Sequence, residues 1–147
     1  MGLDMYLTKK IYIGAPWEHR KVKAAVKISV GENKIAINPK KISYIEEEVV
    51  TWRKANQIHA WFVENVQKGV DDCATYQVSK ELLEQLKELC LKVKAEKNSN
   101  LLPPADGFFF GSTEIDDGYW QDIDQTIKNL VDLEDRFEVT YQYQSSW

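Results

Sequence analysis

LDMYLTKKIYI, residues 3–13, decides the fold class of this chain because its apolar side chains fall on alternate positions. A period of two is typical of a β-strand with one face on a core and the other in water. The stretch therefore predicts a strand whose inner face carries Met5, Leu7, Ile11 and Ile13, and whose outer face carries Tyr6, Thr8, Lys10 and Tyr12.

Two further stretches favour strands. In residues 21–30 apolar and polar side chains alternate more cleanly still, and the turn residues 31–33 follow. A returning strand over 34–38 would place Ile35 and Ile37 inward, so residues 21–38 predict a β-hairpin. Residues 42–52 are rich in β-formers, and Glu46, Glu47 and Glu48 interrupt their apolar face. We expect a bulge or a strand end at that point.

The apolar spacing then changes to three and four, which is typical of helices. It predicts one helix over 54–67, a second over 80–96 with Ser79 as N-cap, and a third capped by Asp116 or Asp117. Cys90 falls on the apolar stripe of the second helix, so we expect it in the core. Between the last two helices, residues 107–111 predict a short strand or a tight loop. A last strand follows, with Phe137, Val139, Tyr141 and Tyr143 inward.

Strands come first and helices after them, with no repeated β-α-β unit, which favours an α+β fold. We expect a mainly antiparallel sheet of about four to six strands with three helices packed on one face. The final strand must return to this sheet, so both ends of the chain should lie near it. A length of 147 residues without an internal repeat or linker predicts a single globular domain over 1–147.

Composition and charge exclude several classes of protein. The sequence contains no long apolar stretch or secretory signal, and two cysteines make no disulfide framework, so we expect a cytoplasmic protein without membrane contact. Residues 1–44 carry nine basic and three acidic side chains, whereas 101–147 carry two and ten. The net charge of -4 and the absence of a basic cluster disfavour direct nucleic-acid binding.

Recognised catalytic and cofactor signatures are absent from the sequence. Its histidines and cysteines lack paired ligand spacing, so we expect no metal and no cofactor. Asp71 and Asp72 stand directly before Cys73, and their negative charge would disfavour a thiolate there. No nucleophile elbow and no glycine-rich phosphate loop occurs.

Polar residues among aromatic ones around the first helix are the composition of a small-molecule pocket. The candidate pocket residues are His59, Trp61, Asn65, Asp72, Cys73, Tyr76, Phe110, Ser112 and Thr113. This hypothesis requires residues 59–76 and 108–113 to converge on one concave site. In the alternative, His59 is a hydrogen-bonded histidine at the edge of the core.

The acidic C-terminal third suggests a second candidate site. Apolar side chains occupy the inner face of the third helix, so its carboxylates should face solvent. Their negative charge could steer a basic partner toward this face. This candidate face consists of Asp116, Asp117, Asp122, Asp124 and Asp132. In the alternative, these charges merely keep the protein in solution.

Several motifs resemble a family of small proteins found in bacteriophages, prophages and bacterial mobile elements. They are Gly2-Leu3-Asp4-Met5-Tyr6-Leu7, Trp61-Phe62-x-x-Asn65 after His59, Asp71-Asp72-Cys73, Leu101-Leu102-Pro103 and GFFFGST at 107–113, and the resemblance covers residues 2 to about 130. It implies a phage or mobile-element setting in a bacterial cytoplasm. It implies no activity and no functional residues.

Two hypotheses for function follow. In the first, the chain is a small accessory protein, monomeric or homodimeric, that binds a macromolecular partner, with a basic protein as one candidate. In the alternative, it is a small-molecule-binding protein or enzyme with a pocket around His59, Asp72, Cys73 and the loop 108–113. The missing catalytic signature favours the first, and the polar groups among aromatics favour the second.

Overall fold

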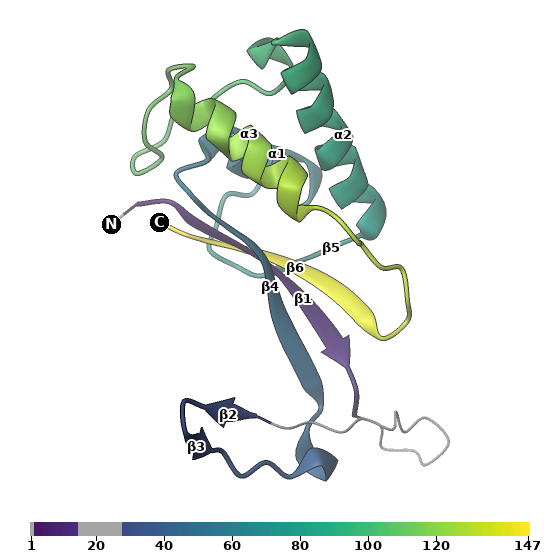
Figure 1. The fold of residues 1–147 in the computed structure, drawn as a ribbon. Coiled ribbons are helices and arrows are strands. Elements are labelled where there is room, and N and C mark those ends of the chain that lie inside the picture. The colour runs from purple at the N-terminus through teal and green to yellow at the C-terminus, as the bar shows by residue number, and fades with distance from the viewer. Residues whose placement is uncertain (1, 15–27) are drawn as a thin grey trace.

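The predicted first strand lies in the middle of an antiparallel sheet. The computed structural model describes residues 2–14 and 28–147, and its main sheet has the order β4-β1-β6-β5. The central strands are β1 (Asp4–Tyr12) and β6 (Val139–Ser146), and the edges are β4 (Tyr44–Arg53) and the short β5 (Tyr76–Val78). All three pairings are antiparallel. The return of the last strand to the sheet is confirmed, and both ends of the chain lie beside each other (Figure 1).

The predicted interruption of the fourth strand is a β-bulge. Leu7 pairs with Val50 and Thr8 pairs with Glu48, so Val49 is an extra residue without a partner in β1. A bulge of this kind increases the local twist of an edge strand. It directly follows the three glutamates that broke the apolar pattern.

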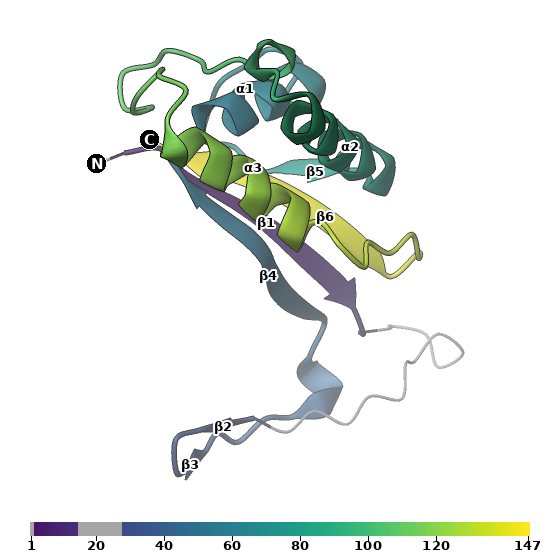
Figure 2. The same cartoon turned by 45° about the horizontal axis from the view of Figure 1, so that its top comes forward.

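The helices cover one face of the main sheet, which confirms the α+β class (Figure 2). They are α1 (Asn56–Asn65), α2 (Lys80–Glu96) and α3 (Asp117–Asn129). Ser79 caps α2 by accepting a hydrogen bond from the Leu82 N–H, and Asp116 caps α3 through the Tyr119 N–H. Within the described residues, no helix has both the length and the apolar character that a membrane span requires.

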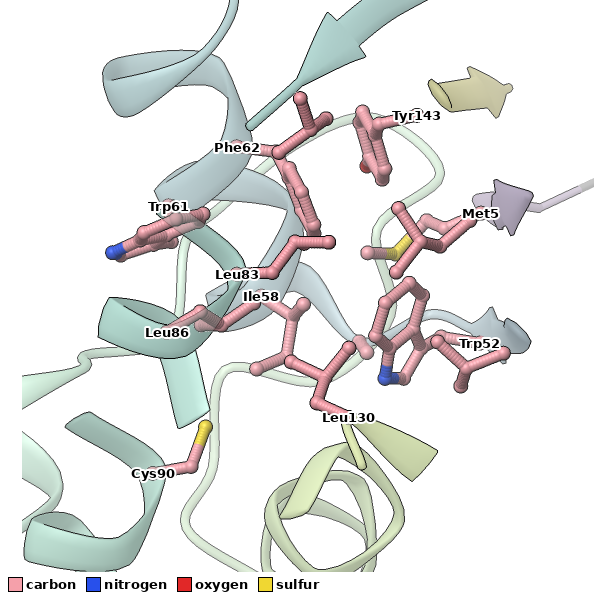
Figure 3. Packing of buried hydrophobic residues seen from close by; sticks show 14 of the residues in the cluster. Met5, Trp52, Ile58, Trp61, Phe62, Leu83, Leu86, Cys90, Leu130 and Tyr143 are labelled. Atoms are coloured by element: carbon pink, nitrogen blue, oxygen red, sulfur yellow. The ribbon is translucent and has the colours of Figure 1, made fainter. Parts of the chain in front are cut away.

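The core lies between the sheet and the helices (Figure 3). Phe62 of α1 stacks on Tyr143 of β6 with ring centroids 3.8 Å apart, and its edge contacts Trp52 of β4. The Trp52 indole donates to the Thr126 hydroxyl at 2.9 Å, which ties α3 to the sheet. Cys90 is fully buried, as predicted, and burial raises the pKa of its thiol to about 12.

The predicted hairpin differs most from the structure. Residues 21–27 lie outside the described residues, and the remainder forms a separate two-stranded sheet of β2 (Ser29–Val30) and β3 (Asn33–Lys34). Ile35, expected inward, is half exposed. In Figures 1 and 2 the helices pack on the main sheet and not on this small one, so none of the described helices covers Ile35. A short 3₁₀ turn, η2 (Pro39–Lys41), leads from it to β4.

Smaller features agree with the expectations only in part. Residues 107–111 form a turn, which is the tight loop of the two alternatives expected there, and the short strand β5 lies between the first two predicted helices, where no strand was predicted. Val131 is exposed because α3 ends at Asn129, and Phe137 is exposed because β6 begins only at Val139. The 3₁₀ turn η3 (Ser99–Leu101) follows α2.

Candidate functional site: the Phe108 turn and its neighbouring depressions

The glycine-bounded segment 107–111, here the Phe108 turn, is held by the buried side chain of Asn56. Asn56 is the first residue of α1 and is 2% exposed. Its Oδ1 accepts from the Ala105 N–H at 3.1 Å, and its Nδ2 donates to the carbonyls of Phe110 and Ser112 at 3.0 and 2.9 Å. One side chain thus fixes the loop on both sides of the turn.

Backbone contacts complete the support of the turn. The Leu3 N–H donates to the Phe109 carbonyl at 3.1 Å, which joins the turn to the start of β1. Phe110 N–H donates to the Gly107 carbonyl at 3.2 Å. Gly111 has a φ of +87°, and an added Cβ would stand 3.2 Å from the Lys54 side chain, so both conformation and space favour glycine there.

The three phenylalanines of the turn lie in different surroundings. Phe108 is 91% exposed and contacts only the edge of its neighbour Phe109 among the aromatic rings of the described residues. Phe110 is buried and packs edge-on against His59 at 5.0 Å, with Trp147 at 6.4 Å. The turn therefore anchors itself through Phe110 and presents Phe108 to solvent.

His59 is fully buried and uses both ring nitrogens. Nε2 donates to Asp71 Oδ1 at 2.9 Å, because a carboxylate can only accept, and Nδ1 then accepts from the Tyr143 hydroxyl at 2.7 Å. The Trp147 indole donates to the same Asp71 oxygen at 3.2 Å. This network joins α1, the loop after it, β6 and Trp147.

Burial sets the protonation of this network. It lowers the pKa of His59, although the adjacent Asp71 carboxylate acts in the opposite direction. Burial likewise raises the pKa of Tyr143. His59 is thus neutral near pH 7, and neither nitrogen is free to take a proton from a substrate.

A depression of about 500 Å³, here the His59 depression, opens beside the Phe108 turn. Its lining combines apolar side chains with three carboxylates and one lysine. The lining residues are His59, Ala60, Val63, Glu64, Lys68, Gly69, Asp71, Ala105, Asp106 and Phe110. The exposed side chains Glu64, Lys68 and Asp106 lie at its rim. Its volume is within the usual range of ligand pockets.

A second depression of about 280 Å³, here the Asp122 depression, is lined by mostly polar residues. Its lining includes Arg53, Asn56, Ser112, Asp116 and Asp122. The Gln57 amide donates to Asp122 Oδ2 at 3.2 Å. Burial raises the pKa of Asp122 to about 6, because its hydrogen bond to Gln57 only partly offsets the loss of water.

The sequence-predicted pocket residues separate into groups. His59 and Phe110 meet at the His59 depression, whereas Ser112 lines the Asp122 depression and Thr113 is exposed. Trp61 packs on Phe62 in the core, and the exposed Asn65 donates to the Trp61 carbonyl within α1.

The remaining pocket candidates lie next to the end of β6. The Tyr76 hydroxyl donates to both carboxylate oxygens of Asp72 at 3.0 Å. Cys73 is exposed, and its carbonyl accepts from the Gln144 amide at 3.2 Å. These contacts fix the segment after Asp71 and thereby help to place the Asp71 carboxylate.

The five aspartates of the predicted acidic face have different surroundings. Asp116 caps α3, Asp122 turns toward Gln57, and Asp124 pairs with Lys94 of α2 at 2.6 Å. Asp117 and Asp132 are exposed. No group of three His, Cys, Asp or Glu side chains within residues 2–14 and 28–147 is arranged to hold a metal ion.

Several residues of this region were outside the predicted site. Asn56 reads as an ordinary polar residue at a helix start, and its partners lie 49 to 56 positions away. Tyr143 reads as a core residue of an alternating strand. The pair Asn56-Gln57 places two amide side chains on a helix predicted to be buried. Because buried polar groups need hydrogen-bond partners, this pair is the sequence feature that indicates a polar contact in this region.

Comparison of the chain with models of known protein families, with curated proteins and with solved structures gave no match.

Proposed function

We propose that this chain is a small accessory protein that acts by binding a protein partner, and that the Phe108 turn is its contact site. The observation that carries the proposal is the 91% exposure of Phe108 on a turn fixed by a buried asparagine. The exposed ring leaves apolar surface in water, and a partner that covers it would remove that surface from water.

The energetics of such a contact support the proposal. Burying one phenylalanine side chain is worth about 2 to 3 kcal/mol. Because hydrogen bonds from Asn56 and Leu3 already order the turn, little conformational entropy is lost when a partner binds. Aromatic anchors on ordered backbone are typical of binding hot spots.

The proposed setting follows from the resemblance to phage and mobile-element proteins. The partner would then be a protein of the bacterial host or of the element itself, met in the cytoplasm. The fold contributes a rigid support for the turn and supplies no catalytic arrangement at Phe108.

The test uses two phenylalanines of nearly equal exposure. Phe137 is 86% exposed and precedes β6, so Phe137→Ser is a matched control for Phe108→Ser. Immobilised protein is exposed to lysate of a bacterial host, and retained proteins are quantified by mass spectrometry. We expect a protein retained by wild type and Phe137→Ser and lost with Phe108→Ser. Equal retention by both variants would contradict the proposal.

A second candidate function is small-molecule binding in the His59 depression, which its volume of about 500 Å³ favours. Since both nitrogens of His59 are occupied, this candidate is a binding site and not a base-catalysed enzyme. Saturation-transfer NMR with a fragment collection tests it. Fragments that bind wild type and lose binding in Ala60→Phe, which fills the depression, would support it, and an absence of such fragments would count against it.

A further inference from the structure

The His59 depression begins where the Phe108 turn ends. Phe110 belongs to both, since it is a residue of the turn and lines the depression. Ala105 and Asp106, which directly precede the turn, line the depression too, so a partner segment on Phe108 lies next to it. Whatever enters the depression is then part of the same contact.

The lining has two chemical characters. Ala60, Val63, Ala105 and Phe110 offer apolar surface, to which Phe110 contributes an aromatic ring. Carboxylates of Glu64, Asp71 and Asp106 line the same space. Among the described residues of the lining, Lys68 is the one cation beside three carboxylates, so this part of the depression carries an excess of negative charge.

The Asp71 carboxylate is oriented for a further contact. Its Oδ1 accepts from His59 and from Trp147, and no donor among the described residues reaches its Oδ2. The side chain is 34% exposed, so the carboxylate as a whole is partly open to solvent. Because His59 is neutral, it does not cancel the charge of Asp71.

We propose that the His59 depression receives an arginine side chain of the protein partner, an inference that rests on the proposed function. An arginine has an apolar stem for Ala60 and Val63, a planar head that stacks on aromatic rings, and several donors for carboxylates. Lysine presents a strongly hydrated point charge and fits the apolar part less well. The partner segment thus combines apolar surface for Phe108 with a neighbouring arginine.

The test uses a defined probe and the whole chain. Acetyl-Ala-Arg-Ala-amide is titrated into ¹⁵N-labelled protein, and the peptide with citrulline in place of arginine is the uncharged control. We expect saturable shifts at the amides of residues 59–71 and 105–110 and at the Trp147 indole. Citrulline should bind about fivefold or more weakly, because the charge is lost.

Variants assign the binding to the carboxylates. Asp71→Asn keeps an acceptor for His59 but loses the charge, and Asp106→Asn changes an exposed residue without a hydrogen bond in the described structure. Each should weaken arginine binding by about threefold or more, whereas the exposed control Asp135→Asn should not. Asp106→Asn keeps the test valid if Asp71→Asn does not fold.

Several outcomes would overturn the inference. The first is an absence of shifts, or equal shifts with the arginine and citrulline peptides. The second is a set of shifts that maps to the Asp122 depression or to α3. The third is a set of shifts at the His59 depression when the protein alone is concentrated, which would make a second copy of the chain the occupant. If Phe108→Ser abolishes partner capture while the arginine probe fails, the inference is wrong and the proposed function stands. If Phe108→Ser has no effect on capture, the proposed function itself fails.

Discussion

The two depressions beside the loop 105–113 differ in the kind of group that burial acts on. The His59 depression contains a fully buried base, and removal from water lowers its pKa. The Asp122 depression contains a half-buried acid, and removal from water raises its pKa to about 6. Burial thus favours the neutral form of both His59 and Asp122. Because one is a base and the other an acid, the two side chains change the stability of the fold in opposite directions as pH changes.

Asn56 supports the loop from which both depressions are built, so its removal should have the largest effect. Asn56→Ala leaves the buried carbonyl of Phe110 and the amide of Ala105 without their partners. We expect a loss of about 3 kcal/mol in the free energy of unfolding, measured by urea denaturation. Asn129→Ala, which removes a hydrogen bond within α3, is the control and should cost well under half as much.

His59→Phe should affect the first depression alone. It leaves the buried Tyr143 hydroxyl without an acceptor, and we expect a loss of about 2 kcal/mol near pH 7.5 in urea unfolding. Asn65→Ala, on the exposed side of the same helix, should change stability by about 0.5 kcal/mol or less. Equal effects of these two variants would show that the His59 network does not contribute to stability.

The stability of the fold should depend on pH in opposite directions through His59 and Asp122. Because the folded-state pKa of His59 lies below its ordinary value of 6.5, the unfolded chain takes up the proton first as pH falls below 6.5. Wild type should therefore lose stability below pH 6.5, so the difference in free energy of unfolding between wild type and His59→Phe should become smaller. A gap that stays constant from about pH 7.5 to about pH 5 would contradict the lowered pKa.

Asp122→Asn should change stability in the opposite direction, with its effect at neutral pH rather than at low pH. The folded protein binds the proton of Asp122 at about pH 6 and the unfolded chain only near 3.8, so the charged carboxyl destabilises the fold above pH 6. We expect this variant to be more stable than wild type at about pH 7.5, by about 1 kcal/mol after allowing for partial exposure, and equal to it near pH 4. A variant less stable than wild type at neutral pH would refute the raised pKa.

Phe108→Ser should have the smallest effect on stability. The side chain is exposed, so we expect a change within about 0.5 kcal/mol in urea unfolding, unlike the changes at the residues that support the turn. A larger loss would show that Phe108 contributes to the fold, and its proposed role as a free contact residue would then fail.

The main elements of the fold could be predicted from the sequence because their patterns are long. The alternation in 3–13 and the helical spacing in 80–96 each report one face buried against a shared core. The three-residue strand β5 is too short to show a period. Ile35 follows the alternation but lies just beyond the two-residue strand β3 and outside the main sheet, because alternation does not specify which sheet a strand joins.

The candidate site was only partly predictable for a related reason. His59 and Phe110 were recognised from their residue types, and they do meet. The support from Asn56 and the end of the network at Trp147 depend on contacts between positions far apart in the chain. No local pattern distinguishes Phe108 from Phe110, although one is exposed and the other is buried by the turn.

Site-specific photo-crosslinking shows whether a protein partner covers Phe108. Benzoylphenylalanine is incorporated at position 108 or at the equally exposed position 137, and each protein is irradiated in bacterial host cells. We expect a discrete crosslinked product from position 108 and none of that size from position 137. The same products from both positions, or none from position 108, would contradict it.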